Sequence, residues 1–349
     1  AALFMLGEAH AWKGELDQAG QYFQVILVEA ENNDDLLDDE GSARLGLGAI
    51  AYESNDLDTA EKHASLALDI GQRRHDEDMP ARCTLILARV HQARGQTAQA
   101  RALLQALAVR LQRPLLLREV QAWQAQLALA AGDVAAASNW HAAITAQGEH
   151  IPLTLQEREA LIVARLQIAQ NESGLALKLL EGWRGGAHAD GRTRSELEIL
   201  GLMALAYAAQ GNTPRAEQAL TRALTLGEPR GYRRIFLDEG ERLAPLLRAL
   251  IPQLKKRPVA AYAASLLRDL EPRRLAPGQP PSSPLLEPLS AQEQRVLRLL
   301  VAGLSNPEIA RELVVSTNTI KTQVKSIYRK LDVTTREQAR QAARELKLL

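Results

Sequence analysis

The sequence predicts an all-α protein, and three observations support this fold class. Aromatic residues make up only 4% of the 349 residues, whereas Ala, Leu, Gln, Arg and Glu, which lose little rotamer freedom in a helix, are abundant. The longest apolar run, from Ile199 to Ala209, has the length of a buried helix and falls well short of the roughly 20 residues that span a membrane. A turn motif also recurs about every 40 residues.

The first predicted domain is an array of helical hairpins over residues 1–228. Its recurring motif places a Gly or Asn turn five residues before an alanine. Gly or Asn accepts the left-handed backbone that ends one helix, a polar neighbour caps the next helix, and alanine lets two helices approach closely. The aligned alanines are 37 to 41 residues apart: Ala19, Ala60, Ala100, Ala137, Ala176 and Ala216. One hairpin cannot bury its own apolar face, so we expect six of them to stack into a superhelix.

The array resembles the tetratricopeptide class, whose repeats usually have about 34 residues. The spacing here is longer and the Trp-Leu-Gly-Tyr pattern of that class is only partly present, which indicates longer, divergent repeats. We expect the four tryptophans to pack in the core, with stacking on a sugar or aromatic inducer as the alternative. They are Trp12, Trp123, Trp140 and Trp183.

A helical connector over residues 229–271 and a Pro-rich linker over 272–288 are expected next. The connector contains the segment "RIFLDEG" from Arg234 to Gly240, and we expect its acids Asp238 and Glu239 to serve in packing rather than in acid–base chemistry. A further helix is predicted from Pro258 to Leu270. The linker contains six prolines, from Pro272 to Pro288 inclusive, and they exclude regular helix there. The linker therefore acts as a tether.

The last predicted domain, residues 289–349, is basic and compact. It carries eleven bases and six acids, although the whole chain has a net charge of zero. Three serines, Ser290, Ser305 and Ser316, are placed to cap three successive helices. Apolar positions at helical spacing give each helix one buried face: Val296, Leu297, Leu300 and Val301, then Ile309, Ala310 and Leu313, then Ile320, Val324, Ile327 and Leu331.

The other face of the third helix predicts contact with DNA. No acid occurs between Thr317 and Lys330, and a helix with such a face fits the major groove of B-DNA, about 12 Å wide. The side chains suited to reading bases are Lys321, Thr322 and Lys325. Those suited to phosphate lie around the N-terminus of the helix or further along it: Ser316, Thr317, Asn318, Thr319, Arg329 and Lys330.

The stretch from Leu289 to Ala339 resembles the LuxR-type helix-turn-helix. The matching positions are Leu289, Glu293, Val296, Leu297, Gly303, Ser305, Asn306, Glu308, Ile309, Ala310, Leu313, Ser316, Thr319, Lys321, Lys330, Leu331, Val333, Arg336 and Ala339. The resemblance implies a four-helix domain whose third helix reads the major groove through Lys321, Thr322 and Lys325. It also implies a fourth helix, from Thr335 to about Leu346, that supplies a dimer contact through Ala339, Ala342 and Leu346. Departures from the family pattern are Gln292, Arg295, Gln323 and Asp332.

Taken together, the array, the "RIFLDEG" segment, the tether and the helix-turn-helix are similar to the C-terminal half of the large ATP-binding LuxR-type regulators, the MalT-like family. Members of that family carry an N-terminal nucleotide-binding switch domain, and no G-x-x-x-x-G-K-[ST] motif occurs in this chain. The resemblance therefore implies ATP binding in a part of the full-length protein outside this chain. No cofactor is expected in the chain itself, and no enzymatic activity.

Composition argues against several other classes of site. The seven histidines show no i, i+4 pair and the acidic run from Glu29 to Glu40 lacks a calcium-loop pattern, so no metal site is predicted. The single cysteine, Cys83, cannot form an internal disulfide and is expected to be buried. With no membrane-spanning run, the sequence predicts a cytoplasmic protein without a membrane partner.

Two functions follow from these observations. The first is a sequence-specific transcription activator that binds double-stranded promoter DNA as a dimer or higher oligomer, with RNA polymerase as a possible partner. Its array would sense a small-molecule inducer or a regulatory protein through residues that the sequence does not identify. The alternative is a protein-interaction scaffold whose C-terminal module serves mainly for dimerisation.

Overall fold

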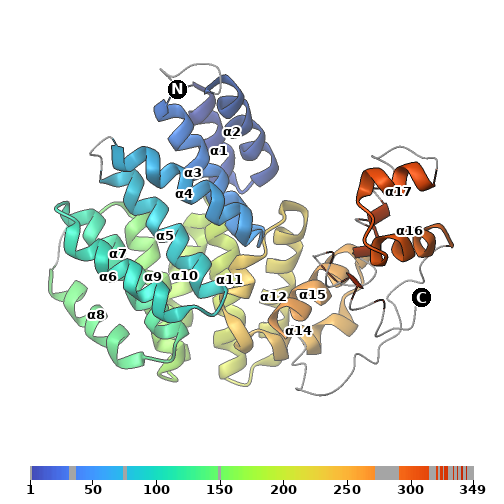
Figure 1. The fold of residues 1–349 in the computed structure, drawn as a ribbon. Coiled ribbons are helices and arrows are strands. Elements are labelled where there is room, and N and C mark those ends of the chain that lie inside the picture. Colours follow the sequence, from blue (N-terminus) through green and yellow to red (C-terminus); the bar gives the residue numbers. More distant parts are fainter. Residues whose placement is uncertain are drawn as a thin grey trace. The chain divides into compact units, whose positions relative to one another are not determined.

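The computed structural model describes residues 2–30, 37–73, 77–147, 151–271 and 291–313, together with residues 320, 323, 324, 326–328, 333, 336, 339, 340 and 343. All regular elements within these residues are helices, as the sequence predicts (Figure 1). The chain forms two compact units, Ala1–Pro272 and Arg273–Leu349. The first holds the array and the helices that follow it.

The array consists of six helix pairs in the described part of the first unit, coloured from blue to yellow in Figure 1. In chain order the pairs are α1 (Ala2–Lys13) with α2 (Leu16–Ala30), α3 (Leu37–Glu53) with α4 (Leu57–Arg73), α5 (Asp78–Ala93) with α6 (Thr97–Arg110), α7 (Pro114–Ala130) with α8 (Val134–Gln147), α9 (Leu153–Ala169) with α10 (Ser173–Ala189), and α11 (Thr193–Ala209) with α12 (Thr213–Gly227). The predicted six hairpins are therefore confirmed.

The turn within each pair has the predicted left-handed backbone. Positive φ angles between 63° and 81° occur at Gly14, Asn55, Gly95, Gly132, Asn171 and Gly211. All six aligned alanines have no exposed surface. Three of the polar neighbours cap the second helix as predicted, because Asp56, Asp133 and Asn212 each accept a hydrogen bond from the backbone N–H three residues later.

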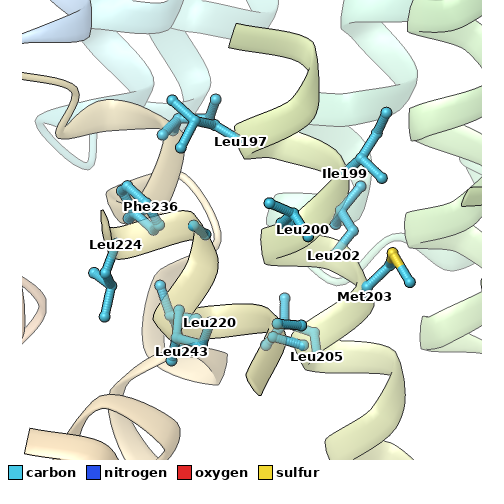
Figure 2. Packing of buried hydrophobic residues seen from close by; sticks show 14 of the residues in the cluster. Leu197, Ile199, Leu200, Leu202, Met203, Leu205, Leu220, Leu224, Phe236 and Leu243 are labelled. Carbon is cyan, nitrogen blue, oxygen red and sulfur yellow. The ribbon is translucent and has the colours of Figure 1, made fainter. Parts of the chain in front are cut away.

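The core of the array is a series of apolar clusters, each shared by neighbouring helix pairs. Phe23 lies at the centre of the first cluster, between α1 and α3, and Trp123 belongs to a cluster between α5 and α7. The largest cluster packs α11 against α12 and the helices that follow. In Figure 2 it can be seen that Leu220, Leu224 and Phe236 lie beside α11, which carries Leu197 and Leu200. Stacking of neighbours therefore buries faces that single hairpins leave exposed.

The first helices also contact the last ones. α1 and α11 touch, and α3 touches the short helix α13 (Arg234–Leu237). Gly14 lies so near Thr193 and Tyr232 that an added Cβ would come within 2.9 Å of the threonine side chain. The array therefore closes on itself, so hairpins far apart in the sequence stabilise each other directly.

After α12 the chain runs through short helices into one longer helix. These elements are η2 (Glu228–Arg230), α13, η3 (Gly240–Arg242), α14 (Ala244–Leu250), η4 (Ile251–Gln253) and α15 (Arg257–Leu270). α15 coincides with the helix predicted from Pro258 to Leu270. Val259, Ala263 and Leu266 of α15 are buried in the same cluster as α11 and α12. The connector is therefore packed onto the end of the array.

Candidate functional site

The described part of the C-terminal unit contains the predicted first and second helices. They are α16 (Ala291–Val301) and α17 (Asn306–Glu312), joined through Gly303 with a φ of 101°. Ser305 is the N-cap residue of α17, as predicted. Its backbone N–H donates to a carboxylate oxygen of Glu308 at 2.7 Å, and its hydroxyl donates to the same oxygen at 2.6 Å. These hydrogen bonds lower the pKa of the Glu308 carboxyl.

One apolar cluster holds this unit together. It joins buried side chains of α16 and α17 to helical residues further along the chain, namely Val296, Leu297, Leu300, Ile309, Ala310, Ile320, Val324 and Ile327. Val301 and Leu313 pack against the cluster and are partly buried. The predicted inward faces are thus confirmed, and Leu331 lies outside the described residues.

A buried polar contact also fixes the third predicted helix. Glu293 of α16 is only 7% exposed, and the hydroxyl of Ser326 donates to it at 2.8 Å. The guanidinium of Arg336 donates to the backbone carbonyl of Leu304. Glu293 matches the family pattern in the sequence, but its buried hydrogen bond to the third predicted helix was not predicted. The sequence did contain one indication of a buried acid, because Glu293 lies one helical turn before Val296 and Leu297, which were predicted to be buried.

The residues predicted to contact DNA fall outside the described part of the chain. These are Lys321, Thr322 and Lys325 for base reading, and Ser316, Thr317, Asn318, Thr319, Arg329 and Lys330 for phosphate. Of the predicted dimer contacts, Ala342 and Leu346 also lie outside it. Ala339 is described, has no exposed surface and packs in the apolar cluster of its own unit. Its side chain therefore contributes to the core of the domain, and the dimer contact stays a prediction.

In the first unit, a buried charged network joins distant helices around Glu53, at the end of α3. One carboxylate oxygen of Glu53 accepts from Arg89 of α5 and from Arg194 of α11, each at 3.1 Å. Burial raises the pKa of Glu53, but the charges of Arg194 and Arg89 outweigh burial and lower it. The backbone carbonyl of Glu53 also accepts from the N–H of Arg233, just before α13, at 2.7 Å.

The acids of the "RIFLDEG" segment belong to the same network. Tyr52 donates its hydroxyl to Asp238 at 3.0 Å, and Asp238 pairs with Arg234. Glu239 pairs with Arg165 of α9 at 2.5 Å. Each acid is therefore held by a partner in the array or the connector, as the packing interpretation expects. Asp238 and Glu239, which follow α13, tie this segment to α3 and α9.

The pKa of Glu198 gives this network a pH dependence. Burial raises this pKa, but Arg165 and Arg194 outweigh burial and bring it to about 2, from 4.5. A carboxyl with a depressed folded pKa contributes stability above its unfolded pKa and loses it as the pH falls through the folded pKa. We therefore expect the difference in free energy of unfolding between the wild type and Glu198→Gln to shrink between pH 4.5 and pH 2.

Urea unfolding at a series of pH values measures this difference. Glu181→Gln, which removes an exposed pair with Arg184, is the control and should show no such trend. A wild type that keeps a constant advantage over Glu198→Gln down to the lowest pH would contradict the assignment.

The structure can also be compared with the predictions for metal sites, membrane helices, the cysteine and the tryptophans. Within the described residues, no three His, Cys, Asp or Glu side chains converge as they would around a metal ion, and no helix is long and apolar enough to cross a bilayer. Cys83 is buried as predicted, and burial raises its pKa to about 12. Trp123 is packed in the core, whereas Trp12 is 53% exposed, so the core expectation is wrong for Trp12.

Two families of known proteins match the chain. The family described as "MalT-like TPR region" matches residues 1–253, and the family described as "Bacterial regulatory proteins, luxR family" matches residues 287–343. The first match covers well over half of the chain.

The chain is also similar to individual transcriptional regulators. Proteins named "HTH-type transcriptional regulator MalT" from two strains of Klebsiella pneumoniae are each 33% identical to the chain over 233 residues. The matched region covers 62% of this chain and 26% of each relative. The chain thus spans about a quarter of the length of the curated relatives that it matches.

Proposed function

Because the chain belongs to the MalT-like TPR family and ends in a luxR-family regulatory domain, we propose that it is a DNA-binding transcriptional regulator. Its C-terminal unit binds promoter DNA, and its helical array senses an effector. The observation that carries the proposal is the luxR-family match over residues 287–343, supported by the buried stripe of Ile320, Val324 and Ile327.

The buried stripe supports the assignment of the third helix to the major groove. Helix residues three and four apart share one face, and Ile320, Val324 and Ile327 occupy that face in the core. Lys321, Thr322 and Lys325 each follow one of these positions or its neighbour in the sequence. We assign base reading to them, and phosphate contact to Ser316 through Thr319 with Arg329 and Lys330.

The proposal extends to the partners of a regulator of this kind. A dimer on DNA matches two half-sites about one helical turn apart, and an activator also contacts RNA polymerase. ATP-dependent switching would reside outside this chain. The chain itself carries no catalytic role in this proposal, and a protein that acts on promoters in this way works in the cytoplasm.

We expect Lys325→Ala to reduce sequence discrimination on DNA by about 5- to 150-fold, because one bidentate base contact supplies roughly 1–3 kcal/mol of discrimination. Arg329→Ala should instead weaken binding to every duplex alike. It should also reduce the salt slope by about 0.9, because one phosphate contact is lost. Fluorescence anisotropy with a duplex selected from a random pool and an unrelated duplex measures both effects at several salt concentrations.

Arg110→Ala, an exposed change in α6 of the array, is the control and should leave both quantities unchanged. Equal discrimination by the wild type and Lys325→Ala would remove the base-reading assignment. A salt slope that does not respond to Arg329→Ala would remove the phosphate assignment.

A further inference from the structure

The array encloses a pocket of about 420 Å³ on the side where its odd-numbered helices meet. Side chains from α1, α3, α5, α7, α9 and α11 line it. This volume is in the range of small-molecule sites. Its wall is strongly charged, because arginines and glutamates from several of these helices line it.

Most of the arginines in this wall are already paired. Arg89 and Arg194 share Glu53, Arg194 also pairs with Glu198 at 2.8 Å, and Arg192 pairs with Glu157. Arg158 of α9 differs, because it is half-buried and has neither an ion pair nor a hydrogen bond among the described residues. Its guanidinium lies 4.5 Å from the centre of the Trp123 ring.

The surroundings of Arg158 leave its charge poorly compensated. Burial and the charge of Arg194 lower the pKa of Arg158 to about 10, although Glu119 and Glu198 act in the opposite direction. The indole of Trp123 is shared, since the guanidinium of Arg89 lies 4.7 Å from the same ring. A cation that is withdrawn from water without a partner costs free energy. An anion in the pocket would recover that cost.

An exposed aromatic side chain faces the same pocket. Trp12 of α1 lines it and is 53% exposed. Phe4 of the same helix is another lining residue. A large aromatic surface that is left open to solvent in a pocket is suited to stacking with a flat apolar group. Trp12 and Arg158 therefore contribute an aromatic surface and a cation to the lining of one pocket.

We propose that this pocket binds a small organic anion, with its acidic group on Arg158 and a flat apolar body against Trp12. The inference rests on the proposed sensing role of the array and names the chemical class of the effector. A carboxylate and a phosphate ester share the required chemistry, because guanidinium forms paired hydrogen bonds with either group.

The test uses four probes that share one ring and differ in charge: benzoate, phenyl phosphate, uncharged benzyl alcohol and cationic benzylamine. Each is titrated into the full chain by calorimetry, with the melting temperature as a second readout. We expect saturable binding and a raised melting temperature with at least one of the two anions, and with neither of the other probes. The better of the two anions identifies the acidic group of the effector.

Variants of the full chain locate the site. Arg158→Met should weaken binding of the better anion by about tenfold or more, the loss of one charge-assisted contact. Trp12→Ala should weaken binding as well, while Arg101→Met, at an exposed position of α6, should not. Without any ligand, Arg158→Met should melt at the same temperature as the wild type or higher, because it removes an uncompensated cation.

Several results would overturn the proposal. They are the absence of saturable binding by both anions, tighter binding of benzylamine than of either anion, and equal affinity of the wild type and Arg158→Met. DNA binding by the same samples is measured in parallel and depends on the other unit. A chain that binds DNA but neither anion would contradict the pocket proposal alone, whereas a chain that does not bind DNA would contradict the proposed function.

Discussion

We expect Glu53→Gln to lower the free energy of unfolding of the array by about 3–5 kcal/mol, because removal of one partner leaves buried charge uncompensated. The Glu53 side chain is 8% exposed and that of Arg89 is 14% exposed. Among the residues that the structure describes, Arg89 would keep only Asp238, at 3.8 Å, as an ion-pair partner. Arg194 would keep Glu198. The contacts of α3 with α5 and α11 would therefore weaken together.

Urea unfolding of the full chain, followed by circular dichroism, measures this loss. The matched control is Glu61→Gln, which removes a partner of Arg94 that is 38% exposed. A surface pair of this kind contributes about 0–1 kcal/mol. If Glu53→Gln costs no more than this control, the buried network does not hold the closed array together.

We expect Phe23→Ala to be about as damaging, at roughly 3–5 kcal/mol, because it opens a cavity in the first cluster. Phe23 has no exposed surface, and its ring centre lies 5.9 Å from that of Phe4. Two glycines make room for the ring. A Cβ added at Gly7 would lie 2.6 Å from a ring carbon of Phe23, and one added at Gly46 would lie 2.4 Å from another.

This packing makes a double-mutant cycle informative. Gly46→Ala alone should cost about 1–3 kcal/mol, because the new methyl group meets the ring. In the Phe23→Ala background the ring is gone, so the same change should be neutral or stabilising, helped by the higher helix propensity of alanine. Unfolding free energies of the four proteins give the coupling. Additive costs would contradict the packing of Phe23 between the two glycines.

The repeat structure could be predicted from the sequence because its determinants are local. A left-handed turn at Gly14 or Asn55 and a fully buried alanine five residues later depend on residues within one hairpin. The closure of the array could not be predicted in this way. Glu53 meets Arg89, 36 residues away, and Arg194, 141 residues away. A periodic pattern specifies only which faces are buried, and not which distant hairpins meet.

The same distinction between local patterns and contacts of distant helices applies to the candidate sites. The inward stripe of the third helix in the C-terminal domain was predictable from helical spacing, and Ile320, Val324 and Ile327 confirm it. The pocket around Arg158 was not predictable, because its lining converges from six helices. Ala339 illustrates a further limit, since the family pattern did not reveal that its side chain is buried in the core of its own domain.

We propose above all that the C-terminal unit of this chain reads DNA sequence. Equilibrium binding of the full chain to a selected duplex and to a shuffled duplex of the same length and composition tests it most directly, at one fixed salt concentration. We expect a preference of at least about a thousandfold for the selected duplex, the lower end of the range for specific DNA-binding proteins. Equal affinity for the two duplexes would contradict it.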